Sequence, residues 1–365
     1  MRAPRAQPGI MSIAPYVGGD SRAPGVSRTI KLSSNESALG SSQAAISAYM
    51  GLSTTLHRYP DGNCSELRHA IADVFNLDAA KIICGNGSDE IISLICQAFT
   101  GPGDEVLYSK HGFLMYPISA YAAGAKPVSA PESDLTTNVD ALLAAASDKT
   151  RIAFIANPNN PTGTYISKAE LKRLRDELAE DVILVIDAAY AEYVSRADYD
   201  DGASLVETYD NVVMTRTFSK IFGLGGMRLG WAYMPKEIAD VLNRVRGPFN
   251  VNTAAQAAGA AAVSDIAFTE KVRAHNDKWL PWTRKKIISL GLDVTDSVGN
   301  FLLVCFENTP DHGAEAADNF LRGEGIIVRR MSGYNLPNCL RITIGTEEEM
   351  HMLVSSLARF LGKKI

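Results

Sequence analysis

Residues 181–187 read DVILVID, the most apolar segment that the sequence offers for a buried strand. Around it, similar short apolar runs alternate with segments of helical pattern, which we expect at 88–99 and 168–178. The expected strands are KIIC (81–84), EVLYS (105–109), RIAFIA (151–156), DVILVI (181–186) and NVVMT (211–215). Such an alternation is typical of a mostly parallel sheet that helices cover on both faces. Residues 229–234 are expected to add a strand that runs the other way.

The pattern of expected helices and strands changes after Gly247. The uncharged stretch 247–264 predicts a helix with its cap, and a second, longer helix is expected over 266–289. Further strands are expected at 301–306, 326–329 and 339–344. A chain of 365 residues is long for one compact core, so we expect two domains, the second a smaller α+β unit. The predicted parts are an N-terminal arm (1–30), a large domain (31–247) and a small domain (248–365).

Composition narrows the possible partners. The net charge is −5 and no block of Lys and Arg occurs, which makes nucleic acid an unexpected partner. No apolar stretch is long enough to predict a membrane span, and the first 20 residues lack the apolar core of a signal peptide. The five cysteines are odd in number, far apart and without a C-x-x-C pair. We therefore expect neither a zinc or other metal site nor a disulfide framework, and a cytoplasmic location.

The informative polar residues follow the predicted strands, where ligands bind in α/β sheets. The segment GNGSDE (85–90) joins a strand to a helix, and its backbone N–H groups could bind an anion at the helix N-terminus. Ser88 and Asp89 could equally cap that helix, and taken alone this interpretation is the better one. In NPNNPTG (157–163), Asn160 could hydrogen-bond a ligand hydroxyl, although such loops are usually simple turns.

Asp187 ends the most apolar strand, and Tyr190 follows three residues later. A lone aspartate in this position is more often a turn cap. Its functional interpretation is a carboxylate that pairs with the protonated ring nitrogen of a pyridine cofactor, which keeps the ring an electron sink.

Lys220 lies in TFSK (217–220), just before the glycine-rich stretch 223–228. Most lysines are solvated, but one held among apolar residues and glycines is less hydrated. Its pKa can fall, and the neutral amine can then attack an aldehyde. Arg228 and Ser219 could together bind a phosphate. Arg341 lies on an apolar strand, where it forms either an internal salt bridge or a bidentate clamp on a carboxylate or phosphate.

These segments lie in a series of longer strings: IAPYVGG (13–19), KLSSNES (31–37), RYPDG (58–62), GNGSDE (85–90), NPNNPTG (157–163), VIDAAYAEY (185–193), TRTFSKIFGLGGMRLGW (215–231) and VRRMSGYNLPNCLRITIG (328–345). In these strings the chain resembles the histidinol-phosphate aminotransferase family, which uses pyridoxal 5'-phosphate (PLP) and has fold type I. The resemblance spans nearly the whole sequence. It implies an α/β large domain with a mostly parallel, seven-stranded sheet and a smaller α+β domain.

The resemblance also implies roles for individual residues. Lys220 would form the Schiff base with PLP and then move the proton of the reaction, and Asp187 would pair with the pyridinium nitrogen. Phe113 would stack on the ring, with Tyr116 as the alternative, because Lys110-His111-Gly112 replaces the family's usual Pro-Thr type of sequence before it. The other residues expected to hold the cofactor are Tyr190 and Asn160 at its 3-oxygen, and Ser219, Arg228, Gly87, Ser88 and Asp89 at its phosphate.

Two further implications concern partners. Tyr59 would reach the PLP phosphate of a neighbouring subunit, which implies a homodimer. Arg341 would bind the substrate's carboxylate or phosphate, with Tyr16 and Asn35 nearby. A second departure, Ala188 where the family often has Glu after the aspartate, should have a mild effect, since that Glu has no catalytic role in this scheme.

The implied reaction is transamination between L-histidinol phosphate and 2-oxoglutarate in histidine biosynthesis. An aminotransferase for aromatic amino acids is the main alternative, and a decarboxylase for a threonine-phosphate type of substrate is a second. A nucleotide-binding oxidoreductase is disfavoured, because neither glycine cluster matches G-x-G-x-x-G.

Overall fold

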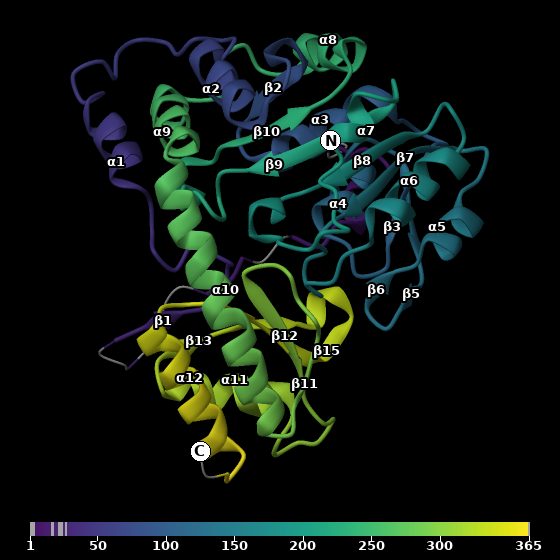
Figure 1. Ribbon diagram of the computed structural model, residues 1–365. Coiled ribbons are helices and arrows are strands. Elements are labelled where there is room, and N and C mark those ends of the chain that lie inside the picture. The colour runs from purple at the N-terminus through teal and green to yellow at the C-terminus, as the bar shows by residue number, and fades with distance from the viewer. Residues whose placement is uncertain (1–3, 16–17, 21–24, 26–27, 364–365) are drawn as a thin grey trace.

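A seven-stranded sheet forms the centre of the computed structural model, which describes residues 4–15, 18–20, 25 and 28–363 (Figure 1). Its strand order is β2-β10-β9-β8-β7-β3-β4. The strands are β2 (Ile82–Gly85), β3 (Glu105–Ser109), β4 (Lys126–Ala130), β7 (Thr150–Ala156), β8 (Ile183–Asp187), β9 (Val212–Thr217) and β10 (Gly230–Tyr233). β10 runs antiparallel to both its neighbours, and the other pairs are parallel. The predicted sheet, including its reversed strand, is confirmed.

Helices cover both faces of this sheet, because successive side chains of each strand point to opposite sides. In β8, Val185 packs into one core cluster while Leu184 and Ile186 pack into the other. The first cluster includes side chains of α3 (Ser88–Phe99), α4 (Met115–Ala122) and α8 (Lys236–Val245). The second includes α2 (Ser65–Phe75), α5 (Val139–Ala145), α6 (Lys168–Glu177), α7 (Ala203–Val206) and α9 (Thr253–Ser264).

A second, antiparallel sheet follows the order β11-β12-β15-β14. Its strands are β11 (Asp293–Val294), β12 (Phe301–Cys305), β15 (Leu336–Thr343) and β14 (Arg329–Met331), and α10 (Ile266–Ser289), α11 (Ala314–Gly323) and α12 (Glu347–Phe360) lie beside it. In Figure 1 the long helix α10 runs from the large sheet down past the small one. The bounds predicted for this helix, 266–289, are confirmed.

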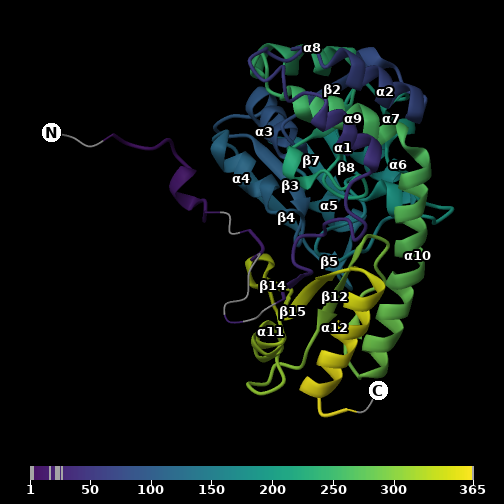
Figure 2. The same ribbon diagram turned by 90° about the vertical axis from the view of Figure 1, so that its left-hand side faces the viewer.

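The N-terminal region contributes to this second part of the molecule. β1 (Ile30–Lys31) pairs in parallel with β13 (Ile326–Ile327), and Ile30 and Leu32 pack in the core of the small sheet. Nearer the N-terminus, η1 (Ile10–Ser12) forms a short turn that contacts α4, on one side of the molecule in Figure 2. The predicted boundaries at residues 30 and 247 stay predictions.

Cys305 and Cys339 form a disulfide, so the expectation that the cysteines form no disulfide framework is wrong for this pair. They are 34 residues apart in sequence but are register partners on the antiparallel strands β12 and β15. Sequence spacing carries no information on such a cross-strand pairing. Within the described part of the chain, we find no helix that is both long and apolar enough to cross a bilayer.

Candidate active site

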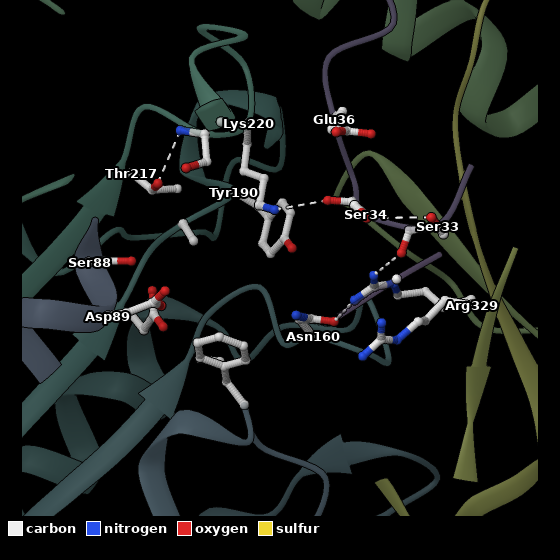
Figure 3. Close-up of a pocket in the computed structure, with 18 of the residues that line it drawn as sticks. Ser33, Ser34, Glu36, Ser88, Asp89, Asn160, Tyr190, Thr217, Lys220 and Arg329 are labelled. Atoms are coloured by element: carbon white, nitrogen blue, oxygen red, sulfur yellow. Dashed lines mark hydrogen bonds between the residues drawn. The ribbon is translucent and has the colours of Figure 1, made fainter. Parts of the chain in front are cut away.

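A pocket lies between the carboxyl ends of β7, β8 and β9 and the antiparallel sheet (Figure 3). Its lining brings together most of the residues that the sequence singled out, although they come from distant segments. Those that line it are Ser88, Asp89, Phe113, Asn160, Asp187, Tyr190, Ser219, Lys220, Arg228 and Arg341. Figure 3 shows Ser88 and Asp89 on one side, Arg329 and Asn160 on the other, and Lys220 beside Tyr190 between them.

Lys220 projects into the middle of the pocket from the loop after β9. Its Nζ donates a hydrogen bond to the Ser34 carbonyl at 3.2 Å and lies 5.8 Å from the centre of the Tyr190 ring. Burial, with a further contribution from the positive charge of Arg341, lowers the pKa of Lys220 to about 8. At neutral pH a useful fraction of this amine is therefore uncharged and nucleophilic.

Asp187 is the last residue of β8 and is only 5% exposed. Its carboxylate accepts hydrogen bonds from the Tyr116 hydroxyl at 2.9 Å and from Thr215 Oγ1 at 3.3 Å. Burial raises the pKa of Asp187 to about 6. Ionising this buried carboxylate costs free energy, and a cation in the pocket would stabilise its ionised form.

Two aromatic residues were alternatives for the ring-stacking position, and the structure places them differently. Phe113 lines the pocket. Tyr116 is fully buried beneath it, with its ring stacked on Phe154 at a centroid distance of 4.6 Å and its hydroxyl on Asp187. Tyr116 therefore orients the aspartate, a role that its sequence position does not indicate.

The turn before α3 lies at one end of the pocket. The helix N-cap is Gly87, with a φ of +84°, and no side chain caps it, so the capping interpretation of Ser88 and Asp89 is wrong. Arg228 donates to Ser219 Oγ at 3.3 Å and to Asp89 Oδ2 at 3.2 Å. The positive φ at Gly87 is the reason that glycine is favoured there, since the tip of the Arg228 side chain, 2.6 Å from the place of a Cβ atom, could move aside. Backbone N–H groups, a hydroxyl and a guanidinium thus converge as a phosphate site needs.

The opposite end of the pocket carries two arginines. Arg341 donates to Asn160 Oδ1 at 2.5 Å and to the Ser33 carbonyl at 2.9 Å. Arg329, on the neighbouring strand β14, is the register partner of Arg341 and also lines the pocket. Sequence reasoning missed Arg329, although it lies in the same string as Arg341, because strand register brings the two together.

Two further predicted residues that the structure describes do not line the pocket. Asn35 is fully buried and donates to the Tyr190 hydroxyl at 2.8 Å, so it holds that hydroxyl, and it does not itself line the pocket. Tyr59 is 83% exposed and stacks on Phe249 at 4.8 Å, away from the pocket of its own chain. Tyr16 falls outside the residues that the structure describes.

Known proteins resemble this chain over its whole length. The family model for class I and II aminotransferases matches residues 27–357. A histidinol-phosphate aminotransferase from Paramagnetospirillum magneticum is 58% identical over 99% of this chain and 100% of its own length. Its counterpart from Rhodospirillum rubrum is 56% identical, over 98% of this chain and 97% of its own length.

Solved structures agree with these sequence matches. The histidinol-phosphate aminotransferase of Sinorhizobium meliloti, crystallised in complex with pyridoxal-5'-phosphate, superposes with a TM-score of 0.89 at 25% identity, covering 99% of this chain and 98% of that one. An aspartate aminotransferase from Thermus thermophilus, at 22% identity, shares the fold with a TM-score of 0.81 over 91% of this chain and 92% of its own. The chain therefore belongs to the class I and II aminotransferases and, among them, to the histidinol-phosphate aminotransferase family.

Proposed function

We propose that this protein is a PLP-dependent transaminase that moves an amino group between L-histidinol phosphate and 2-oxoglutarate, a reaction of histidine biosynthesis. The observation that carries the proposal is the composition of one pocket. It combines a lysine of lowered pKa, a buried carboxylate and a phosphate-binding turn with a pair of arginines at the far end. The names and the high identity of the relatives support it.

The residues present fit PLP. In our proposal Lys220 binds the cofactor covalently, Asp187 faces its ring nitrogen, and Phe113 packs on its ring. Tyr190 and Asn160 would hydrogen-bond the 3-oxygen. Ser219, Arg228 and the Gly87–Ser88–Asp89 turn would hold the phosphate. The fit rests on the chemistry of these donors and on the way that Arg228 and Ser219 converge beside the turn at Gly87.

When bound, PLP supplies a cationic ring that withdraws electrons from the carbon next to the substrate's nitrogen. Asp187 keeps the ring cationic, since its ionised carboxylate is stabilised by a positive partner. Lys220 Nζ, when not bonded to the cofactor, would accept the proton from that carbon and deliver it to the cofactor carbon on the other side of the nitrogen, as a 1,3-proton shift requires. A base with a pKa near the working pH suits this task. Tyr116 and Thr215 hold the aspartate in place meanwhile.

The arginine pair supports a phosphate-bearing substrate over an aromatic one. Two guanidinium groups from adjacent strands line the pocket, and a doubly charged phosphate complements their positive charge better than a neutral aromatic side chain does. The same groups can bind the carboxylate of 2-oxoglutarate, because a guanidinium can donate two hydrogen bonds to either a phosphate or a carboxylate.

A half-reaction test separates the alternatives. The PLP-loaded protein is mixed in single turnover with L-histidinol phosphate, phenylalanine or O-phosphothreonine, and the visible spectrum and carbon dioxide release are followed. We expect the fastest spectral change with histidinol phosphate and no carbon dioxide from any substrate. A faster reaction with phenylalanine would favour the aromatic aminotransferase, and carbon dioxide from phosphothreonine would favour the decarboxylase.

We further propose a homodimer in which Tyr59 completes the partner's site. Tyr59 and Leu56 are 83% and 81% exposed, and the apolar side chains of Met50, Tyr49 and Phe249 are also exposed. Large exposed apolar groups of this kind favour an interface. Mixing Tyr59→Ala chains with Lys220→Ala chains should restore activity, because one site of each mixed dimer is then intact. No recovery on mixing would argue against the shared site. The cytoplasmic location stays a prediction.

A further inference from the structure

Glu132 is a buried carboxylate that gathers the polar groups of a neighbouring turn. It accepts hydrogen bonds from Ser109 Oγ at 2.5 Å, from the His111 backbone N–H at 3.0 Å and from His111 Nδ1 at 2.6 Å. The side chains of Glu132 and His111 are only 3% and 7% exposed. Burial raises the pKa of Glu132, but the hydrogen bonds from His111 and Ser109 outweigh it and lower the pKa overall. The carboxylate is therefore charged at neutral pH, and its hydrogen bonds are charge-assisted.

The turn that Glu132 holds leads directly to Phe113. It follows β3, and the Gly112 N–H closes it by donating to the Ser109 carbonyl at 2.7 Å. Lys110 is tied through its own N–H to the Ala130 carbonyl of β4 at 2.8 Å. Phe113 comes next and lines the pocket. The place of the Phe113 ring thus depends on a short turn whose side-chain and backbone donors converge on Glu132.

The hairpin that carries Glu132 also contacts the segment that follows β7, which includes Asn160. It consists of β5 (Glu132–Ser133) and β6 (Thr136–Thr137), and at its tip the Leu135 carbonyl accepts from Thr164 Oγ1 at 2.8 Å. Asn159 Nδ2 donates to the His111 carbonyl at 3.3 Å. Asn160, the next residue, bonds Arg341. One hairpin is therefore attached both to the turn of Phe113 and to the loop of Asn160.

We infer that Glu132 and His111 are positioning residues: the hydrogen bonds between them fix the Phe113 ring against the cofactor and, through Asn159, steady the loop of Asn160. The inference rests on the proposed function, since it needs PLP in the pocket. Neither residue lines the pocket, so neither takes part in the chemistry itself. Their effect is to limit the motion of side chains that contact the ligand, which sites of this kind require.

The test compares variants that break the pair with variants that spare it. His111→Leu removes the donor at Nδ1, whereas His111→Asn keeps an amide N–H near that position. Glu132→Gln keeps the size of the side chain and removes its charge. Glu105→Gln is the matched control, because Glu105 is also a buried carboxylate next to a serine hydroxyl, but at the opposite end of β3. The readouts are the dissociation constant of PLP and the visible circular dichroism per bound PLP, which reports how the ring is held.

We expect His111→Leu and Glu132→Gln to weaken PLP binding about tenfold, as the loss of one charge-assisted hydrogen bond would, and to reduce the dichroism. His111→Asn should stay within about threefold of the unaltered protein, and Glu105→Gln should match it. In a Phe113→Leu background, the effect of Glu132→Gln should be smaller, because the part that acts through the Phe113 ring is already lost.

Unchanged binding and dichroism in His111→Leu and Glu132→Gln would overturn the inference, as would a His111→Asn protein as impaired as His111→Leu. If Glu132→Gln does not fold, the two His111 variants decide alone. These failures differ from a failure of the proposed function, in which the unaltered protein itself would bind no PLP and show no visible band.

Discussion

Replacing Asp187 by Asn should make the cofactor-free protein more stable while it removes most of the activity. The carboxylate is 5% exposed, and burial raises its pKa to about 6 from an ordinary value of 3.8. Above pH 6 the folded chain therefore holds a charge that the unfolded chain would bear more easily. The gap between the two pKa values corresponds to about 3 kcal/mol.

The sign of this effect follows from proton binding. Between about pH 4 and pH 6 the folded state binds more protons than the unfolded state, so its stability falls as the pH rises. Asn carries no charge, so the variant avoids the free-energy cost of burying one. It also loses a charged acceptor for the hydroxyl of Tyr116 or Thr215, which lowers the stability by about 1 kcal/mol. The net expectation at about pH 7.5 is a gain of about 1–2 kcal/mol for the cofactor-free variant.

Urea unfolding of both cofactor-free proteins measures this difference, and it should shrink by about 2 kcal/mol when the pH is lowered to about 4.5. The transamination rate should fall roughly 100- to 1,000-fold, because a buried cation loses its partner. Near-normal rates would exclude the pairing of Asp187 with a cationic ring. A cofactor-free variant that is clearly less stable at both pH values would show that the carboxylate supports the fold instead.

Three further outcomes are expected. Covalent attachment of PLP to the cofactor-free chain should accelerate as the pH rises through about 8, because only the neutral form of Lys220 attacks an aldehyde; stopped-flow absorbance at several pH values checks this. Arg341→Lys should raise KM for both substrates about 10- to 100-fold with a smaller change in kcat, since a lysine cannot bind an anion in a bidentate way; steady-state kinetics would show equal KM values if the clamp were wrong. Reduction of the Cys305–Cys339 disulfide should cost about 3–4 kcal/mol, judged from its 34-residue separation. Alkylation without reductant should leave these two cysteines unlabelled, and labelling of both would contradict the bond.

The sheet was predictable because its strands are buried on both faces and read as apolar runs. The sequence pattern did not predict β4, because β4 is an edge strand. Lys126 is exposed, and the strand has no continuous apolar run. The site followed from the same logic, since the carboxyl ends of parallel strands meet at one edge. Asp187 ends such a strand, Asn160 and Lys220 each follow one, and all three residues line the same pocket.

Contacts that depend on register or on packing between distant elements were not predictable. The adjacency of Arg329 and Arg341 comes from the pairing of β14 with β15. The hydrogen bond from Tyr116 to Asp187 joins a helix to a strand 71 residues away. Asn35 was expected near the substrate, and its hydrogen bond to the Tyr190 hydroxyl joins residues 155 positions apart in sequence. A single sequence holds no signal for these distances.

The central claim is that Lys220 binds PLP covalently, and borohydride reduction tests it most directly. The PLP-loaded protein is reduced, digested and analysed by peptide mass spectrometry. We expect the reduced cofactor on the peptide that contains TFSK (217–220), with loss of the visible band and no label in Lys220→Ala. Absence of covalent cofactor, or its attachment to a different lysine, would contradict the account.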